Sequence, residues 1–210
     1  MDKAMTEQIK LQPCDFLVSV NDRIDLWSSL ERWAIGPYEH AFLYLGELGL
    51  FAKEVREKYP ALQMVGIPMI FESVPMQGVC LRQLRERYGE TVEVMRLFSE
   101  HDRRRIPHIL HSAIKLASDD QAYYDFFCIP LHIIPRILNE KFGMPIPVKY
   151  HRNPQQVCSE ALNEVSIRGG LPDILLRCRQ MGIVPMPGDF VTGSPLLRKV
   201  GRVTLSAEVI

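Results

Sequence analysis

The chain has 210 residues, of which 47% are hydrophobic and 24% charged, and its 25 lysines and arginines equal its 25 aspartates and glutamates. This composition argues against a disordered or fibrous chain, and the balanced charge argues against nucleic-acid and anionic-membrane binders. The length predicts one domain, residues 1–210, with a sizeable core of its own.

Four segments of the first half predict strands, because they are short, rich in apolar residues and bounded by turn residues. They are residues 14–20, 40–46, 64–72 and 91–98. In the second of these, His40 lies on the same face as Phe42 and Tyr44. Pro68 interrupts the third run and indicates an edge or a bulge there. Between the first two strands, residues 26–33 predict a helix.

Helical spacing of apolar residues begins near residue 100 and predicts a helical insertion over about residues 100–150, with helices at 103–116 and 120–139. A further helix contains Cys158 and is expected to end at Gly169-Gly170. A short helix over 172–180 and two strands, 188–191 and 203–209, complete the chain. Strands first, helices next and strands last predict an α+β fold in which an antiparallel sheet packs against helices.

The first twelve residues carry charged and polar side chains without an apolar core, so we expect no signal peptide and no membrane anchor. The most apolar stretch, 126–138, is broken by two prolines and is shorter than the ~18 apolar residues of a membrane-spanning helix. Five cysteines without a Cys-x-x-Cys spacing predict reduced thiols, neither a disulfide framework nor a zinc knuckle. Together these features predict a cytoplasmic protein.

Cys158 is the cysteine whose neighbours suggest chemistry. Asn153 can cap a helix and Pro154 fits its first position, which predicts a helix that begins near Pro154 and carries the thiol in its second turn. The positive end of the helix favours a thiolate, provided that a histidine lies beside it. The alternative is a core thiol, since Cys158, Leu162 and Val165 fall on one helical stripe.

His40 is the candidate base, because it opens a strand and therefore lies at the rim of the core. Glu72 ends the next apolar run and is the candidate third residue, which would orient the imidazole ring. Each has an ordinary alternative: His40 as a hydrogen-bonded residue at a strand end, and Glu72 as a solvent-facing strand terminus.

His108 and His111 lie three residues apart on a predicted helix, with His101 and Asp102 just before them. Such spacing can place two imidazoles on one face. The chain has no His-Glu-x-x-His element and no paired thiols, so we expect no functional metal site and no organic cofactor.

Short motifs in chain order resemble the circularly permuted papain-like thiol hydrolases of the permuted NlpC and YiiX-like group. The matching segments are residues 12–18, 38–46, 70–73 with 78–79, 124–126, 157–160, and 184–190 with 194–195. The sequence departs from the family pattern at Cys14, where the family has glycine, and at Phe42, where a small residue commonly follows the histidine.

This resemblance implies a permuted papain-like fold with Cys158 as nucleophile, His40 as base and Glu72 as the third residue. It also implies cleavage of an amide or ester bond through a thioester, with a peptide, a peptidoglycan fragment or a lipid acyl group as substrate. Two alternatives are a catalytically inactive papain-like binding module and a thiol acyltransferase.

Overall fold

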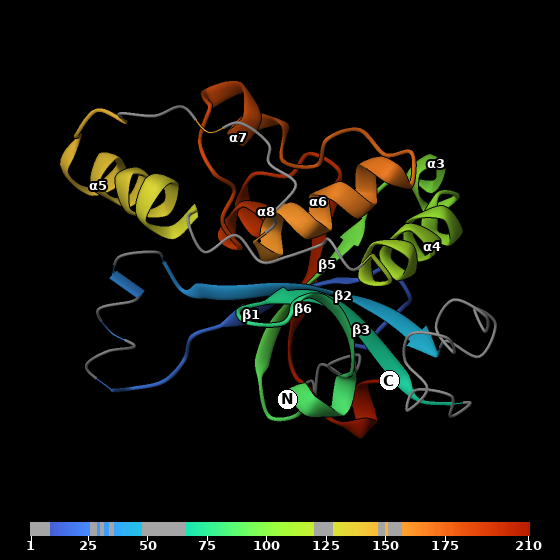
Figure 1. Cartoon of the computed structure of the whole chain (residues 1–210). Coiled ribbons are helices and arrows are strands. Elements are labelled where there is room, and N and C mark those ends of the chain that lie inside the picture. The colour runs from blue at the N-terminus through green and yellow to red at the C-terminus, as the bar shows by residue number, and fades with distance from the viewer. Residues whose placement is uncertain are drawn as a thin grey trace, which may run out of the picture.

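Six antiparallel strands form one sheet in the computed structural model, which describes residues 9–25, 29, 32–33, 36–47, 66–119, 128–146, 150 and 157–210. The strands are β1 (Phe16–Val20), β2 (Tyr38–Glu47), β3 (Pro68–Val74), β4 (Gly78–Gln83), β5 (Thr91–Leu97) and β6 (Leu197–Thr204). Their order across the sheet is β4-β3-β2-β1-β5-β6, and Figure 1 shows the sheet beneath a layer of helices. The predicted α+β fold class with an antiparallel sheet is confirmed.

The helical layer covers one face of the sheet. It consists of α3 (Glu100–Arg103), α4 (Ile106–Ala117), α5 (Ile134–Phe142), α6 (Cys158–Arg168), α7 (Leu176–Met181) and α8 (Gly188–Thr192). A π-helical turn, η3 (Ile129–Ile133), leads into α5, and two short 3-10 helices, η2 (Leu84–Arg87) and η4 (Ala207–Val209), complete the described elements. None of the helices in these described ranges is long and apolar enough to cross a membrane.

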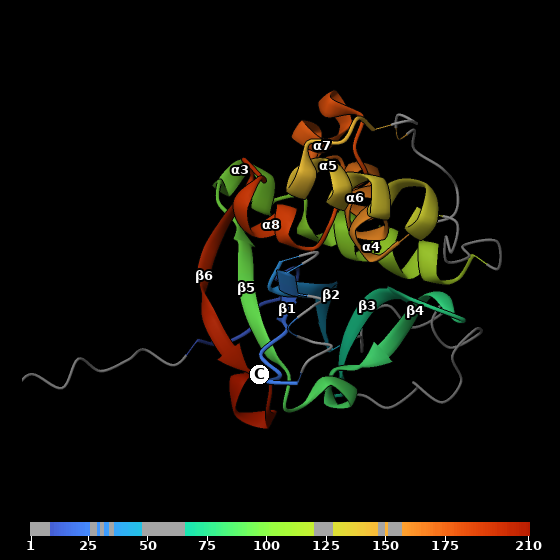
Figure 2. The ribbon, with the colours of Figure 1, turned by 90° about the vertical axis from the view of Figure 1, so that its left-hand side faces the viewer.

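Both faces are buried at the centre of the sheet, where β1 is buried at every position, whereas the edge strand β6 is largely exposed. On the helical side, Phe16 and Phe71 pack with residues of α4 and α6 such as Ile109 and Val165. A second core on the opposite face is built from Leu17, Phe42, Tyr44, Ile70, Leu84, Val92, Val94, Leu205 and Val209. Figure 2 shows the sheet curving around this side, with η2 and η4 below it.

A β-bulge lies beside His40. Ser19 on β1 pairs with His40, but the next residue, Val20, pairs with Tyr38, so that Glu39 is the extra residue. Bulges bend a strand and change the direction of a side chain, and they are common beside active sites. A second register shift lies between Tyr44 and Gly46, close to the start of β3, where Pro68 led us to expect an edge or a bulge.

Two strand predictions for the last part of the chain were wrong, and one strand was not predicted. Residues 188–191 form helix α8, because the Asp189 carboxylate accepts the backbone N–H of Met186 and its own carbonyl accepts that of Gly193. The last strand is residues 197–204, and residues 207–209 are 3-10 helix. Strand β4 was not predicted; it is joined to β3 by a tight turn with positive φ at Met76 and Gly78.

The predicted helix over 103–116 is two helices, α3 and α4, and the one over 172–180 begins only at Leu176. Residues 124–126, most of 26–33 and the first part of 120–139 lie outside the described residues.

Candidate active site

Cys158 is the first residue of α6, not a residue of its second turn as predicted. Val157 is extended (φ −74°, ψ 165°), and its backbone N–H donates to the carboxylate of Glu160 at 3.0 Å. This contact starts the helix at Cys158, whereas the predicted cap at Asn153 and Pro154 lies outside the described residues. In the first turn the thiol is closer to the positive end of the helix, which increases the stabilisation of a thiolate.

The structure brings His40 and Glu72 together across neighbouring strands. Nε2 of His40 is 2.7 Å from Oε2 of Glu72. Glu72 is completely buried, so the solvent-facing alternative for this residue is wrong. A carboxylate in this position fixes the orientation of the ring and leaves Nδ1 as the nitrogen available for another partner.

That partner is Cys158, whose thiol shares a hydrogen bond with the His40 side chain. The sulfur also accepts the backbone N–H of Ala41 and lies 3.9 Å from Oγ of Ser159. Cys158 as a residue is 8% exposed, and the side chain of His40 is 16% exposed. Cys158, His40 and Glu72 therefore form one hydrogen-bonded chain from the start of α6 to the middle of the sheet.

The electrostatic interactions among Cys158, His40 and Glu72 favour a thiolate beside an imidazolium. Burial alone would raise the pKa of Cys158, but the hydrogen bond and charge of His40 lower it below the usual 9.0. Burial alone would lower the pKa of His40, but Cys158 and Glu72 raise it to about 9. Burial also acts to raise the pKa of Glu72, yet His40 and Arg87 hold it below its ordinary range.

Sequence reasoning missed two arginines that contact Glu72. Nη2 of Arg87 donates to Oε2 at 2.6 Å, and Nη1 of Arg82 lies 3.4 Å from Oε1. Arg82 lies on β4, where Cys80 is the direct partner of Glu72, so a prediction of that strand would have placed Arg82 diagonally across from Glu72. Arg87 ends η2, and no pattern in the sequence marks it.

Cys14, Cys80 and Cys178 lie in environments that make their thiols less acidic. No disulfide joins any of the five cysteines, and burial raises the pKa of Cys80 to about 11 and of Cys178 to about 12. Cys80 is more exposed than Cys158, yet its thiol is the less acidic one.

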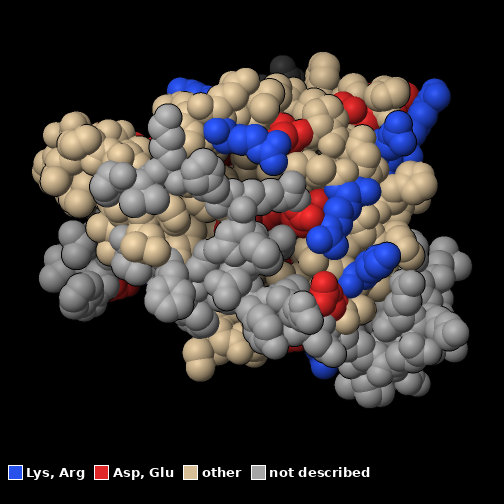
Figure 3. Space-filling model, turned by 45° about the horizontal axis from the view of Figure 1, so that its top comes forward, with Lys and Arg blue, Asp and Glu red and all other residues tan. Residues whose placement is uncertain are grey.

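No group of three or more metal-ligating side chains comes together within the described residues. Of the histidines weighed for a metal, His108 and His111 lie on the exposed side of α4 and His101 lies exposed on α3. Figure 3 shows acidic and basic side chains interspersed over the helical side of the molecule.

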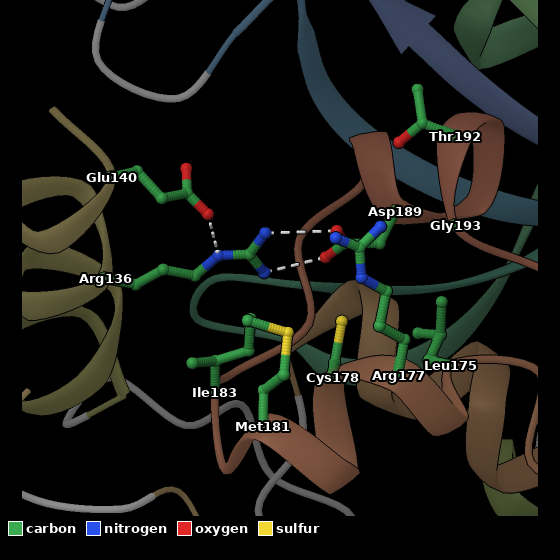
Figure 4. Close-up of a pocket in the computed structure, with 10 residues that line it drawn as sticks. All are labelled: Arg136, Glu140, Leu175, Arg177, Cys178, Met181, Ile183, Asp189, Thr192 and Gly193. Atoms are coloured by element: carbon green, nitrogen blue, oxygen red, sulfur yellow. Dashed lines mark hydrogen bonds and ion pairs between the residues drawn. The ribbon is translucent and has the colours of Figure 1, made fainter.

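A cavity of about 180 Å³ lies among α5, α7 and α8, and neither Cys158 nor His40 lines it. Figure 4 shows the guanidinium of Arg136 among the residues that line this cavity. Both Nη atoms donate hydrogen bonds to Asp189, and Nε donates one to Glu140. Its Nη1 also donates to the Val184 carbonyl, so three of its hydrogen bonds join α5 to α8 and to the segment before α8. We assign this cluster a structural role.

No family model matches the chain, and no curated protein matches it. Among solved structures, the chain resembles the crystal structure of the metalloprotein yiiX from Escherichia coli O157:H7, with 14% identity and a TM-score of 0.49. The likeness covers 93% of this chain and 98% of that chain. A likeness of this size has no bearing on the chemistry, for which the contacts of Cys158, His40 and Glu72 are the evidence.

Proposed function

We propose that the protein is a papain-like cysteine hydrolase that cleaves an amide or ester bond. The observation that carries this proposal is the hydrogen-bonded chain from Cys158 through His40 to Glu72. The same residues support a permuted papain-like arrangement, in which the histidine strand precedes the cysteine helix in the sequence. The substrate classes that we propose are peptides, peptidoglycan fragments and lipid acyl groups.

The residues act in two steps. The Cys158 thiolate attacks the substrate carbonyl, and the imidazolium of His40 gives its proton to the leaving amine or alcohol as a thioester forms. His40 then takes a proton from water as the water oxygen attacks the thioester carbonyl. The C–S bond breaks, the carboxylic acid is released, and the thiolate of Cys158 and the imidazolium of His40 are restored. Backbone N–H groups at the start of α6 are suited to hold the oxyanion.

A reducing compartment such as the cytoplasm fits this chemistry, because a catalytic thiol must stay reduced and none of the five cysteines forms a disulfide. Cell fractionation against compartment markers tests the location.

Limited alkylation tests the proposed nucleophile. The folded protein is treated with substoichiometric iodoacetamide near pH 6, and the labelled cysteine is identified by mass spectrometry. We expect Cys158 to be labelled first, because its pKa is lowered whereas those of Cys14, Cys80 and Cys178 are raised, and we expect His40→Ala to remove this preference.

Cys80 is the internal control, since it is more exposed but has a pKa of about 11. Labelling of Cys80 before Cys158 would mean that exposure governs reactivity and would contradict the proposal. An activated ester that leaves an acyl group on Cys158 separates the remaining alternatives. Release by water indicates a hydrolase, release only by an added amine indicates an acyltransferase, and failure to acylate indicates a binding module.

A further inference from the structure

The two oxygens of the buried Glu72 carboxylate differ in their hydrogen-bond partners. Its Oε2 accepts hydrogen bonds from both His40, at 2.7 Å, and Arg87, at 2.6 Å. Its Oε1 faces only the longer contact to Arg82, at 3.4 Å. Because Glu72 has no exposed surface, these side chains take the place of water in stabilising its charge.

Arg87 is itself held on two sides. Its Nη1 donates to Oε1 of Glu90 at 2.9 Å, and Oε2 of Glu90 accepts the hydroxyl of Ser19 at 2.7 Å. Ser19 is the residue of β1 that pairs with His40 on β2. Glu90 and Ser19 thus connect the guanidinium of Arg87 to β1, the strand that pairs with the histidine strand β2.

Phe42 contacts both the guanidinium of Arg87 and the imidazole of His40. The Arg87 guanidinium lies over the Phe42 ring at 5.6 Å, and the His40 ring stacks on it with centroids 5.8 Å apart and an angle of 28°. A small side chain at this position would leave both groups without this support. The bulky residue that departs from the family pattern therefore has a role in this site.

We propose that Arg87 is a positioning residue of the Cys158–His40 pair, which it serves by holding Glu72 ionised and aimed at Nε2 of His40. This inference rests on the proposed function. With Arg87 in place, the buried group of Cys158, His40, Glu72 and Arg87 contains two negative and two positive charges when the thiolate has formed. Without Arg87 it would carry an excess negative charge in a buried place, and the group would take up a proton more readily.

The test is the pH dependence of Cys158 alkylation by iodoacetamide in wild type, Arg87→Gln, Arg87→Lys and Arg82→Gln. For Arg87→Gln we expect the acid limb of the profile to move up by about one pH unit, and the rate near pH 6 to fall roughly tenfold. Arg87→Lys restores the charge, so its acid limb returns toward the wild-type position. Its maximal rate stays lower, because one ammonium group does not reproduce a fork that binds Glu72 and Glu90 together.

Arg82→Gln is the matched control, because Arg82 contacts the same carboxylate at a longer distance and its side chain is 30% exposed. We expect its acid limb to stay within about 0.3 pH units of the wild type. A folded Arg87→Gln protein whose profile coincides with that of the wild type, or an equal shift in Arg82→Gln, overturns the inference. Failure of the proposed function looks different, since wild-type Cys158 would then show no preferential labelling.

Discussion

At the scale of single residues, the site combines an acidic thiol with a basic imidazole. Neither shift is explained by burial, which opposes both, so the pair owes its charge separation to mutual contact and to Glu72 behind the ring. The first turn of α6 adds a favourable field at the sulfur. The chemistry therefore depends on three side chains from three elements staying in contact.

The protonation of His40 can be measured directly. The imidazole should titrate near pH 9 in the wild type, observed by NMR of the ring C–H groups, because Cys158 and Glu72 favour the charged form. In Cys158→Ser the pKa should fall towards 6.5, since the neighbouring thiolate is lost. Cys178→Ser, which removes a thiol outside the site, should leave the titration unchanged. A wild-type titration near 6.5 would speak against the ion pair.

The same shift has a consequence for stability. The folded pKa of His40 lies above the ordinary 6.5, so its protonation stabilises the fold fully below pH 6.5 and this contribution is lost as the pH rises through about 9. The lowered pKa of Cys158 acts in the opposite direction, since the contribution of its thiolate is present above the ordinary value and lost as the pH falls through the folded pKa.

At the scale of elements, the position of α6 decides where the thiol lies. Its first residue contacts His40 on β2, and its C-terminal end packs closely on α4. A Cβ at Gly169 would lie 2.8 Å from Cα and 2.9 Å from N of Ile109, which is backbone that cannot easily give way. Glycine therefore permits the close approach of the two helices.

Gly169→Ala should push α6 away from α4. We expect the free energy of unfolding to fall by about 2 kcal/mol, as for an overpacked core position, measured by urea denaturation. Lys115→Ala, on the exposed side of α4, is the control and should change the stability by less than about 0.5 kcal/mol. Equal stability of Gly169→Ala and the wild type would show that the helices can separate at no cost.

At the scale of the whole molecule, the sheet has a core on each face, and polar clusters hold the outer helices to these cores. Arg136 on α5 forms one such cluster on the helical side, since it binds Asp189 at the start of α8 with both Nη atoms. Hydrogen bonds and charge from this arginine keep the pKa of Asp189 below its ordinary 3.8, although burial alone would raise it.

Arg136→Gln leaves the Asp189 carboxylate without its counter-charge. We expect a loss of about 2–3 kcal/mol in the free energy of unfolding at pH 7, since breaking a buried pair exposes the desolvation penalty of the remaining ion. The loss should shrink as the pH falls through the folded pKa of Asp189, because a protonated carboxyl needs no cation. Arg177→Gln alters an exposed arginine of the same cavity and should have little effect; equal losses in both variants would contradict the assigned role.

Much of the sheet could be predicted from local patterns. Strand β5 was expected over 91–98 and is residues 91–97. Val92, Val94 and the neighbouring apolar residues strongly favour a buried strand here. The end of α6 at Gly169 was also predicted correctly. Residues 188–191 were not, because their helix depends on the contact between Asp189 and a residue 53 positions earlier, and strand β4 follows a turn with none of the usual hairpin dipeptides.

The sequence by itself determined the α+β class and supplied Cys158, His40 and Glu72 as candidates, because apolar periodicity and residue chemistry are local properties. At Cys14, where the family that the motifs resemble has glycine, the backbone adopts a positive φ of 71°, a conformation that glycine adopts more readily than cysteine. Only the tertiary structure decided that Cys158 opens its helix, that the three candidates touch, and that Arg87 lies behind them. These are contacts between residues up to 118 positions apart, and they are set by strand register, the bulge at Glu39 and the packing of α6 on the sheet.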